Sequence, residues 1–335
     1  MNKKFKHFPK LFLVAFLSLG LLTACASKKA PEDILIKTKQ AIVSLNSGQF
    51  NLNASIIGEA EANKIDLEGD LSSTFVKNPA DGGLDLDLSM TLKGDIKSPE
   101  KNVNLTTQFQ IISQALNYYL KIDEFKTTEE NLQFLTPLIN LYKGKWLHLS
   151  EDFIPESIAS FQRSEADKLK MKQLDDLFVL SELFKVKEDR GSEKIAGHEV
   201  YVLSLELNKE GFKDYFRQIA ILNQKQISDT DLLQLVAPLD QVKDFTIYVD
   251  TETFYVYKAT LESEGQTADN PSGLALKLVF EASEFDQAMK INPPASAEEF
   301  NPLALPADFG LTDPTLPPAE LPLPTNTAPE GVPKS

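Results

Sequence analysis

The sequence is poor in the residues that most often carry out catalysis or bind metals. It has one cysteine, Cys25, and three histidines, of which His148 and His198 lie beyond residue 24. A single cysteine excludes an intramolecular disulfide and a cysteine-based metal site. The chain also lacks a zinc-protease histidine pair, a Gly-x-Ser-x-Gly turn and a glycine-rich phosphate loop. We therefore expect no enzyme, no metal and no cofactor, since a surface hydrolase would need a polar cluster that this sequence does not offer.

Basic residues are also few. The chain has 34 lysine and arginine residues against 49 aspartate and glutamate residues, which gives a net charge of −15. Residues 1–24 hold four of the lysines and no acidic residue, so the remainder carries a net charge of −19. An acidic surface repels nucleic acid and anionic lipid headgroups. The sequence therefore predicts neither a nucleic-acid partner nor a polybasic membrane contact.

The longest N-terminal apolar run, residues 11–22, is too short to cross a bilayer, which takes roughly 20 apolar residues. It follows a lysine-rich start, and the combination is typical of a secretory signal peptide. The segment Leu22-Thr23-Ala24-Cys25 resembles the lipobox of bacterial lipoproteins. This resemblance implies that residues 1–24 are removed and that acyl chains such as palmitate are attached to Cys25. The alternative is an ordinary cleavage site beside an unrelated cysteine.

The lipobox resemblance also implies a location and a division of the chain. Residues 25–31 would form a lipidated tether to the cell membrane or outer membrane, with the protein facing the periplasm or the exterior. Residues 32–292 would form the folded domain. Of the 19 prolines, 11 lie at or beyond Pro293, and this spacing favours an extended chain over a packed core. We expect residues 293–335 to be a disordered Pro-rich tail that contacts an envelope protein.

Alternating apolar and polar residues dominate the first half of the expected domain. In residues 84–93, leucines and Met90 alternate with aspartates, Ser89, Thr91 and Lys93. Similar alternation recurs around residues 65–71, 103–111 and 116–122, with turn residues between them, and again in residues 185–207 and 245–280. A period of two predicts strands with one apolar and one polar face. The count is about eleven strands, which one antiparallel sheet accommodates by curling.

Helical spacing appears between these strands. Pro31 opens one helix, and Ser228 with Asp231 predicts the capped start of another. Further apolar stripes at helical spacing run over residues 171–184, 212–222 and 232–239. The sequence therefore predicts an α+β fold, in which a strongly curved antiparallel half-barrel wraps around several helices.

This order of elements resembles the carrier-type lipoprotein family that includes LolA, LolB, LppX and LprG. Local features that carry the resemblance are Gly144-Lys145-Trp146, the segment from Ala196 to Tyr201, and Ile291-Asn292-Pro293-Pro294. The resemblance implies a cavity between sheet and helices that holds acyl chains. We therefore expect a lipoprotein that binds or shuttles a hydrophobic ligand such as a lipid, a glycolipid or a lipoprotein acyl chain. The alternative is a structural or interaction lipoprotein of the envelope with a filled core.

Six apolar side chains are candidates for the lining of such a cavity. Three belong to the expected helices and three to the expected strands: Phe178, Phe212, Phe216, Trp146, Leu88 and Phe109. For each of them the alternative is ordinary core packing, and the sequence does not decide between the two.

Overall fold

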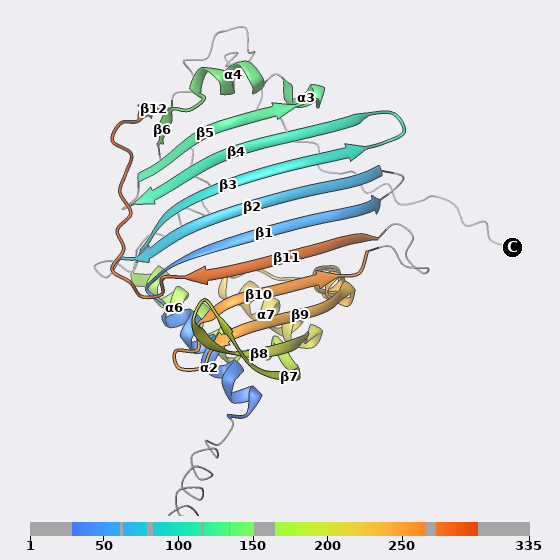
Figure 1. Ribbon diagram of the computed structural model, residues 1–335, viewed down its shortest axis with the longest axis vertical. Coiled ribbons are helices and arrows are strands. Elements are labelled where there is room, and N and C mark those ends of the chain that lie inside the picture. Colours follow the sequence, from blue (N-terminus) through green and yellow to red (C-terminus); the bar gives the residue numbers. More distant parts are fainter. Residues whose placement is uncertain are drawn as a thin grey trace, which may run out of the picture.

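The computed structural model describes residues 29–60, 63–78, 83–114, 117–133, 135–150, 165–265 and 273–300 (Figure 1). The predicted signal peptide, the lipobox and Cys25 lie outside the described residues, as does the predicted tail beyond Phe300. Among the described residues, no helix is both long enough and apolar enough to pass through a bilayer.

The fold is built on a single open sheet of twelve strands. Their order is β12-β6-β5-β4-β3-β2-β1-β11-β10-β9-β8-β7, so β12 and β7 form its edges. Every pairing is antiparallel except that of β12 with β6. The strands are β1 (Ser47–Ala60), β2 (Asn63–Lys77), β3 (Leu84–Lys97), β4 (Asn102–Gln114), β5 (Asn117–Thr127), β6 (Trp146–Leu149), β7 (Phe184–Ile195), β8 (His198–Leu207), β9 (Val242–Asp250), β10 (Val256–Ser263), β11 (Leu274–Ser283) and β12 (Glu298–Glu299).

The sheet has one apolar and one polar face, because its register keeps like residues opposite each other. One continuous row of directly opposed residues crosses the sheet from β4 to β9: Phe109, Met90, Leu71, Leu52, Phe280, Ala259 and Ile247. The row on the opposite face is polar: Gln110, Ser89, Ser72, Asn51, Glu281 and Lys258. A shift of one residue in any pairing would exchange these faces, so the alternation fixes the register.

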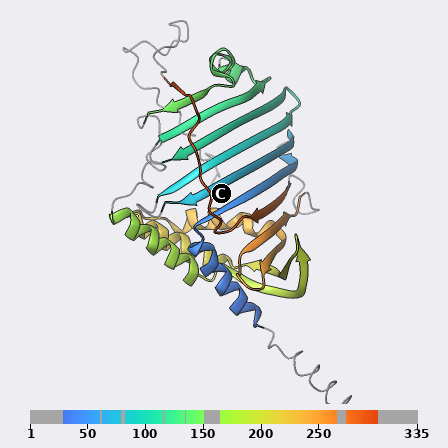
Figure 2. The same cartoon turned by 60° about the vertical axis from the view of Figure 1, so that its left-hand side comes forward.

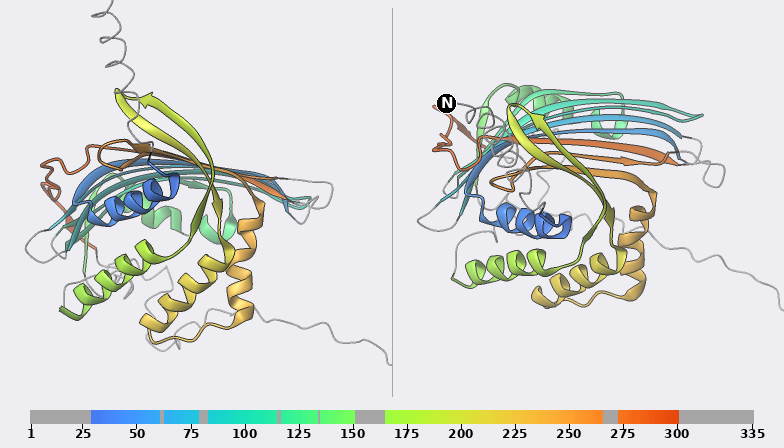
Figure 3. Two further views of the ribbon diagram at one scale, coloured as in Figure 1. Left: turned by 90° about the horizontal axis from the view of Figure 1, so that it is seen from below. Right: turned by 60° about the horizontal axis from the view of Figure 1, so that its bottom comes forward.

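Helices cover the apolar face at one end of the sheet. In Figure 3 the sheet is seen as an arc, with α2 (Pro31–Ser44), α6 (Glu165–Leu180) and α7 (Lys209–Leu222) on its inner side. Figure 2 shows α2 and α6 at the end of the sheet that holds β1 and β7–β11, while β3–β5 stand farther away. The short helices α3 (Glu130–Gln133) and α4 (Leu135–Tyr142) lie at the opposite end, beside β5. The predicted curved sheet with helices on its concave side is therefore confirmed.

Local signals explain where several helices begin and end. Pro31 opens α2, and Glu32 and Asp33 occupy its first turn, as expected. The helix α8 (Asp229–Val236) has the predicted capping box, in which Ser228 Oγ accepts from the Asp231 main-chain N–H at 3.1 Å. It continues into a short 3₁₀ turn, η2 (Ala237–Gln241). The prediction of one helical stripe through Phe184 is wrong at its end, because α6 stops at Leu180 and Phe184 opens β7.

The best-buried core lies where α2 meets β8 and β9. Ile34 and Leu35 of α2 pack with Leu203, Leu205, Ile247 and Val249, and Leu203 and Val249 have no exposed surface. These side chains come from the first helix of the domain and from strands in the second half of its sequence. Their burial holds α2 against the apolar face of the sheet.

The start of the predicted tail is attached to the sheet. From β11 the chain runs along one edge of the molecule to β12 (Figure 1). There the Phe300 main-chain N–H donates to the His148 carbonyl oxygen at 2.9 Å, and the Phe300 ring packs against Tyr142. The sequence predicted about eleven strands, and β12 is the additional one. Its two residues lack the alternation that marks a strand, so only the pairing with β6 identifies it.

Candidate ligand-binding site

An apolar pocket of about 430 Å³ lies between α2, α6 and the apolar face of the sheet. Its volume falls within the range of small-molecule sites, roughly 300–1,000 Å³. Most of its lining side chains are aliphatic or aromatic. They are Leu35, Thr38, Lys39, Ile42, Leu45, Gln49, Phe50, Phe75, Phe178, Phe184, Leu205, Phe245, Ile247, Tyr255, Val256, Ala259, Phe280, Ala282 and Phe285.

Regular spacing on two kinds of element brings these side chains together. On α2, Leu35, Thr38, Lys39 and Ile42 follow the spacing i, i+3, i+4 and i+7 and so share one face of the helix. On the strands, Phe280, Ala259 and Ile247 belong to the apolar row described above, and Phe50, Phe75 and Ala282 lie on the same face. The site therefore follows mainly from amphipathic elements meeting, and Leu45, Tyr255 and Phe285 complete the lining from connecting segments.

Aromatic rings form the floor of the pocket. The Phe50 ring of β1 stacks on Phe280 of β11 with centroids 5.9 Å apart, and it tilts against Phe75 of β2 at 6.4 Å. Gly48 makes room for Phe75, because a Cβ atom there would lie 3.0 Å from the ring. Phe184 and Phe245 meet at 5.6 Å on the other side. These contacts stabilise the rings in place and leave a rigid hydrocarbon surface.

The two most buried polar residues of the lining are satisfied within the protein. The Thr38 hydroxyl donates to the Ile34 carbonyl oxygen at 2.8 Å within α2. The Lys39 ammonium donates to the carbonyl oxygens of Val179 and Ser181 at 2.6 and 2.8 Å, where α6 ends. Burial lowers the pKa of Lys39, and the nearby Glu182 carboxylate opposes that shift. The pocket therefore presents mainly hydrocarbon to a ligand.

The pocket is open to solvent beside the C-terminal end of α2. Ile42 lines the pocket and is 43% exposed, and Gln49 of β1 lines it and is exposed as well. An apolar molecule could enter here without the sheet having to unfold.

The structure distributes the six candidate lining residues over three environments. Phe178 lies in the lining. Phe212 lies outside it, behind the lining residue Phe184, with ring centroids 5.8 Å apart, and Phe216 packs on Phe212 at 6.1 Å. These two α7 residues support the wall from outside.

The three strand candidates lie elsewhere on the sheet. Leu88 and Phe109 belong to the same apolar face, but on β3 and β4, beyond the pocket. Trp146 of β6 is opposite Lys121, in register with the polar face. The alternation of Trp146 with the buried Leu147 turns the two residues to opposite faces, a signal already present in the sequence.

Sequence reasoning missed the contribution of β1 to the pocket. Phe50, Leu52, Ala54 and Ile56 alternate with Asn51, Asn53 and Ser55, which is a clear strand pattern. The predicted meander begins only at residue 65 and so does not include this strand. The four α2 residues and Phe280 were also not proposed as lining, since nothing local marks which apolar side chains face a void.

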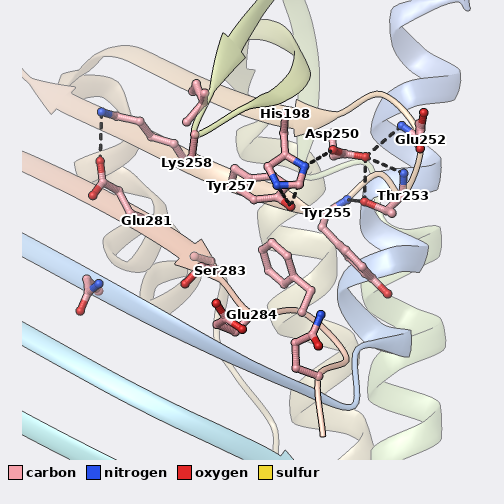
Figure 4. A pocket seen from close by; sticks show the side chains of 16 residues that line it. His198, Asp250, Glu252, Thr253, Tyr255, Tyr257, Lys258, Glu281, Ser283 and Glu284 are labelled. Atoms are coloured by element: carbon pink, nitrogen blue, oxygen red, sulfur yellow. Dashed lines mark hydrogen bonds and ion pairs between the residues drawn. The ribbon is translucent and has the colours of Figure 1, made fainter. Parts of the chain in front are cut away.

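A second, polar groove of about 790 Å³ lies at the ends of β8–β11 (Figure 4). The turn Ala196-Gly197, with φ of 50° and 91°, closes the β7–β8 hairpin and directs His198 into this groove. The His198 ring stacks on Tyr257 with centroids 4.5 Å apart, and the Tyr257 hydroxyl lies 3.2 Å from the imidazole nitrogens. Among the described residues, no serine hydroxyl is hydrogen-bonded to either histidine, and no group of acidic, histidine or cysteine side chains is arranged to hold a metal.

Asp250 organises the turn beside the groove. It is 6% exposed, and its Oδ1 accepts from the main-chain N–H groups of Glu252 and Thr253 at 3.0 and 2.8 Å and from the Thr253 hydroxyl at 2.9 Å. Burial by itself would raise the pKa of Asp250, but these hydrogen bonds outweigh burial, so its pKa lies below the usual value. The carboxylate thus stays charged and fixes the β9–β10 turn.

Tyr255 and Phe285 separate the groove from the apolar pocket. Their rings stack with centroids 4.8 Å apart, and the Tyr255 hydroxyl donates to the Asp286 carboxylate. This hydrogen bond, together with burial, raises the pKa of Tyr255 to about 12. Asp286 also accepts from the Asn46 main-chain N–H at 2.8 Å, so the pair ties the end of β11 to the start of β1.

No protein-family model matches this chain, and no curated protein sequence does either. Solved structures do match it. The lipoprotein LppX of Mycobacterium tuberculosis is similar at 10% identity and a TM-score of 0.30, over 79% of this chain and 100% of its own. A putative outer membrane lipoprotein-sorting protein domain from Vibrio parahaemolyticus matches at 10% identity and a TM-score of 0.19. The match covers 77% of this chain and 93% of that chain. A DUF1329 family protein from Desulfovibrio piger matches at 13% identity and a TM-score of 0.22. The match covers 77% of this chain and 92% of that chain. Each of these matches covers more than three quarters of this chain, at low sequence identity.

Proposed function

We propose that this protein is a membrane-anchored lipoprotein that binds or shuttles a hydrophobic ligand, such as a lipid, a glycolipid or the acyl chain of a lipoprotein. The observation that carries the proposal is the apolar pocket between α2, α6 and the sheet. Its polar lining residues Thr38 and Lys39 already have partners within the protein, so hydrocarbon is the chemistry that the pocket fits best.

The driving force for such binding is burial of methylene groups. Each buried CH₂ contributes about 0.8 kcal/mol, so a chain with about ten buried methylenes gains roughly 8 kcal/mol before the entropy of association is subtracted. The stacked rings of Phe50 and Phe280 are already ordered. Their order reduces the cost of binding, because few side chains have to be immobilised.

The lipid anchor at Cys25 is part of the proposal. Three residues lie between Cys25 and Lys29, and the four residue-to-residue steps would span about 14 Å when fully extended. The Lys29 ammonium lies 4.3 Å from the Phe254 ring centroid, which holds the tether beside the β9–β10 turn. This end of the molecule would face the bilayer, on the periplasmic or exterior side of the cell membrane or outer membrane.

The filled-core alternative is less favoured, since a solid interior would leave no pocket of this size. A contact between the Pro-rich tail and an envelope protein is compatible with ligand binding and is kept in the proposal. Deleting residues 301–335 leaves β12 intact and should abolish crosslinks to such a partner, while ligand binding is unchanged.

The test uses the full chain in phosphatidylcholine vesicles with a photoreactive fatty acid, followed by mapping of the labelled peptides. We expect labelling of peptides that contain Phe50, Phe178 or Phe280. The variant Ala259→Phe places a ring in the pocket and should reduce this labelling at least severalfold. The matched control Thr91→Phe lies on the polar face of β3 and should label like the wild type. Equal labelling of the Ala259→Phe variant and the wild type would contradict the proposal.

A further inference from the structure

The apolar pocket and the polar groove share a wall. Tyr255, Ala282 and Phe285 line both of them, so the two spaces lie on either side of the same side chains. The pocket opens on the apolar face, where Ala259 is opposite Phe280, and the groove on the polar face, where Lys258 is opposite Glu281. An almost wholly apolar space and a groove of mixed lining, with charged and hydrogen-bonding side chains, are therefore adjacent at one end of the sheet.

Of the three shared residues, Ala282 belongs to β11, and Tyr255 and Phe285 contribute large side chains beyond the strand ends. The shared wall is held by one ring stack, between Tyr255 and Phe285, and by the hydrogen bond from Tyr255 to Asp286. The Tyr257 ring contacts the edge of Phe285 at 5.0 Å from the groove side. Tyr255 and Phe285 are therefore the large side chains that lie between the two spaces.

The charges of the groove restrict what could occupy it. Its lining includes the carboxylates of Asp250, Glu252, Glu281 and Glu284, against one lysine (Figure 4). That lysine, Lys258, already forms an ion pair with Glu281 at 3.2 Å. Carboxylates accept hydrogen bonds and repel anions. The groove thus favours a group that donates hydrogen bonds and carries no negative charge.

The groove also lies at the anchored end of the domain. Glu252 and Thr253 of its rim belong to the turn that contacts Lys29, whose ammonium lies 3.5 Å from the Thr251 carbonyl oxygen. A lipid leaving a bilayer near the tether would meet the groove with its headgroup and the pocket with its chain.

We propose that the groove and the pocket form one site for an amphiphile, whose hydrocarbon chain occupies the pocket and whose headgroup, bearing hydroxyl or ammonium donors and no negative charge, occupies the groove. This inference rests on the proposed function, because it adds a headgroup subsite to the same pocket. Tyr255 and Phe285 form the boundary between the two halves.

The test uses the full chain in phosphatidylcholine vesicles and a series of dodecyl compounds with a photoreactive group at the far end of the chain. The compounds carry a maltoside, an ammonium, a sulfate or only a hydroxyl as the head. We expect the maltoside or the ammonium compound to reach half-maximal labelling of pocket peptides at roughly tenfold lower concentration than the sulfate compound, as one or two charge-assisted hydrogen bonds imply. Preference for ammonium alone would assign a cationic head, and preference for both would assign hydroxyl donors as well.

Two variants separate the groove from the pocket. Ser283→Trp fills the groove and should remove the advantage of the preferred head, while labelling by dodecanol stays unchanged. Ser72→Trp, on the same polar face but outside the groove, is the control. The double variant Glu252→Gln with Glu284→Gln removes the charge of two exposed side chains. It should reduce labelling by the ammonium compound severalfold.

The outcomes are distinct. The headgroup subsite is overturned if the sulfate compound labels best. It is also overturned if Ser283→Trp and the double glutamine variant keep the same preference among the headgroups as the wild type. In both cases the proposal for the pocket remains. If dodecanol fails to label the pocket of the wild type, the proposed function itself is overturned.

Discussion

The Lys39 ammonium of α2 donates a hydrogen bond to the Val179 carbonyl oxygen of α6 at a distance of 2.6 Å. A second bond reaches Ser181, so one buried cation satisfies two carbonyl groups at the end of α6. A positive charge at a helix C-terminus is also favourable for the helix dipole. This contact holds the C-terminal end of α6 against α2, beside the pocket.

Replacing Lys39 with methionine should therefore loosen α6. We expect Lys39→Met to lower the free energy of unfolding by about 1–3 kcal/mol, because two partly buried carbonyl groups lose their donor. Urea unfolding followed by circular dichroism measures the change. Lys172→Met, at an exposed position of α6, is the charge-matched control and should be close to neutral. If both variants are equally stable, Lys39 does not fasten α6.

Gly211 in α7 should tolerate no side chain. A Cβ atom there would lie 2.1 Å from the Glu182 carbonyl oxygen, and main chain cannot move aside easily. Although alanine is the better helix former, we expect Gly211→Ala to cost about 1–3 kcal/mol. Gly69→Ala on β2 is the control, since its Cβ would meet Leu92 at an ordinary 3.8 Å. Thermal unfolding of both variants checks the prediction, and an equal melting temperature would contradict it.

Asp250 should make the β9–β10 turn sensitive to acid. Its pKa is lower in the folded protein than in the unfolded chain, so its stabilising contribution is present above the unfolded value of about 3.9 and is lost as the pH falls through the folded value. Asp250→Ala should cost about 1–3 kcal/mol at neutral pH, because two main-chain N–H groups lose their acceptor. The difference from the wild type should shrink in acid. A difference independent of pH would mean that the charge does not contribute.

Tyr255 should have the opposite pH dependence. Its pKa is raised to about 12, so its hydrogen bond to Asp286 stabilises the fold fully below about pH 10, the unfolded value, and is lost as the pH rises through the folded value. Tyr255→Phe keeps the ring stack on Phe285 and removes only the hydroxyl. We expect the variant to lose less stability than the wild type between pH 10 and about 12. The free energy of unfolding is measured with urea across this pH range. If it falls equally with pH in the variant and in the wild type, the hydrogen bond does not contribute.

Much of the fold follows from patterns within short segments. The alternation of Leu84, Leu86 and Leu88 with Asp85 and Asp87 predicted a strand with two unlike faces, and the register confirms it. The prediction of the capped start of α8 at Ser228 was equally local. Such signals depend on side chains within a few residues of each other, so a sequence displays them directly.

The candidate site depends on pairings that no short segment specifies. β1 pairs with β11, which places Phe50 beside Phe280, 230 residues away in the chain. Phe178 and Phe212 have similar helical surroundings in the sequence, yet one lies in the pocket lining and the other behind it.

The sequence by itself determined the two-faced strands, the amphipathic helices and the acidic composition, because each is a property of residue order at short range. Only the tertiary structure decided that α2 and α6 stand far enough from the sheet to leave a pocket, and that Tyr255 and Phe285 divide it from a polar groove. The physical reason is that burying an apolar side chain is favourable whichever apolar surface it packs against. Which partners meet depends on long-range strand pairing and on single contacts such as that of Lys39 with α6.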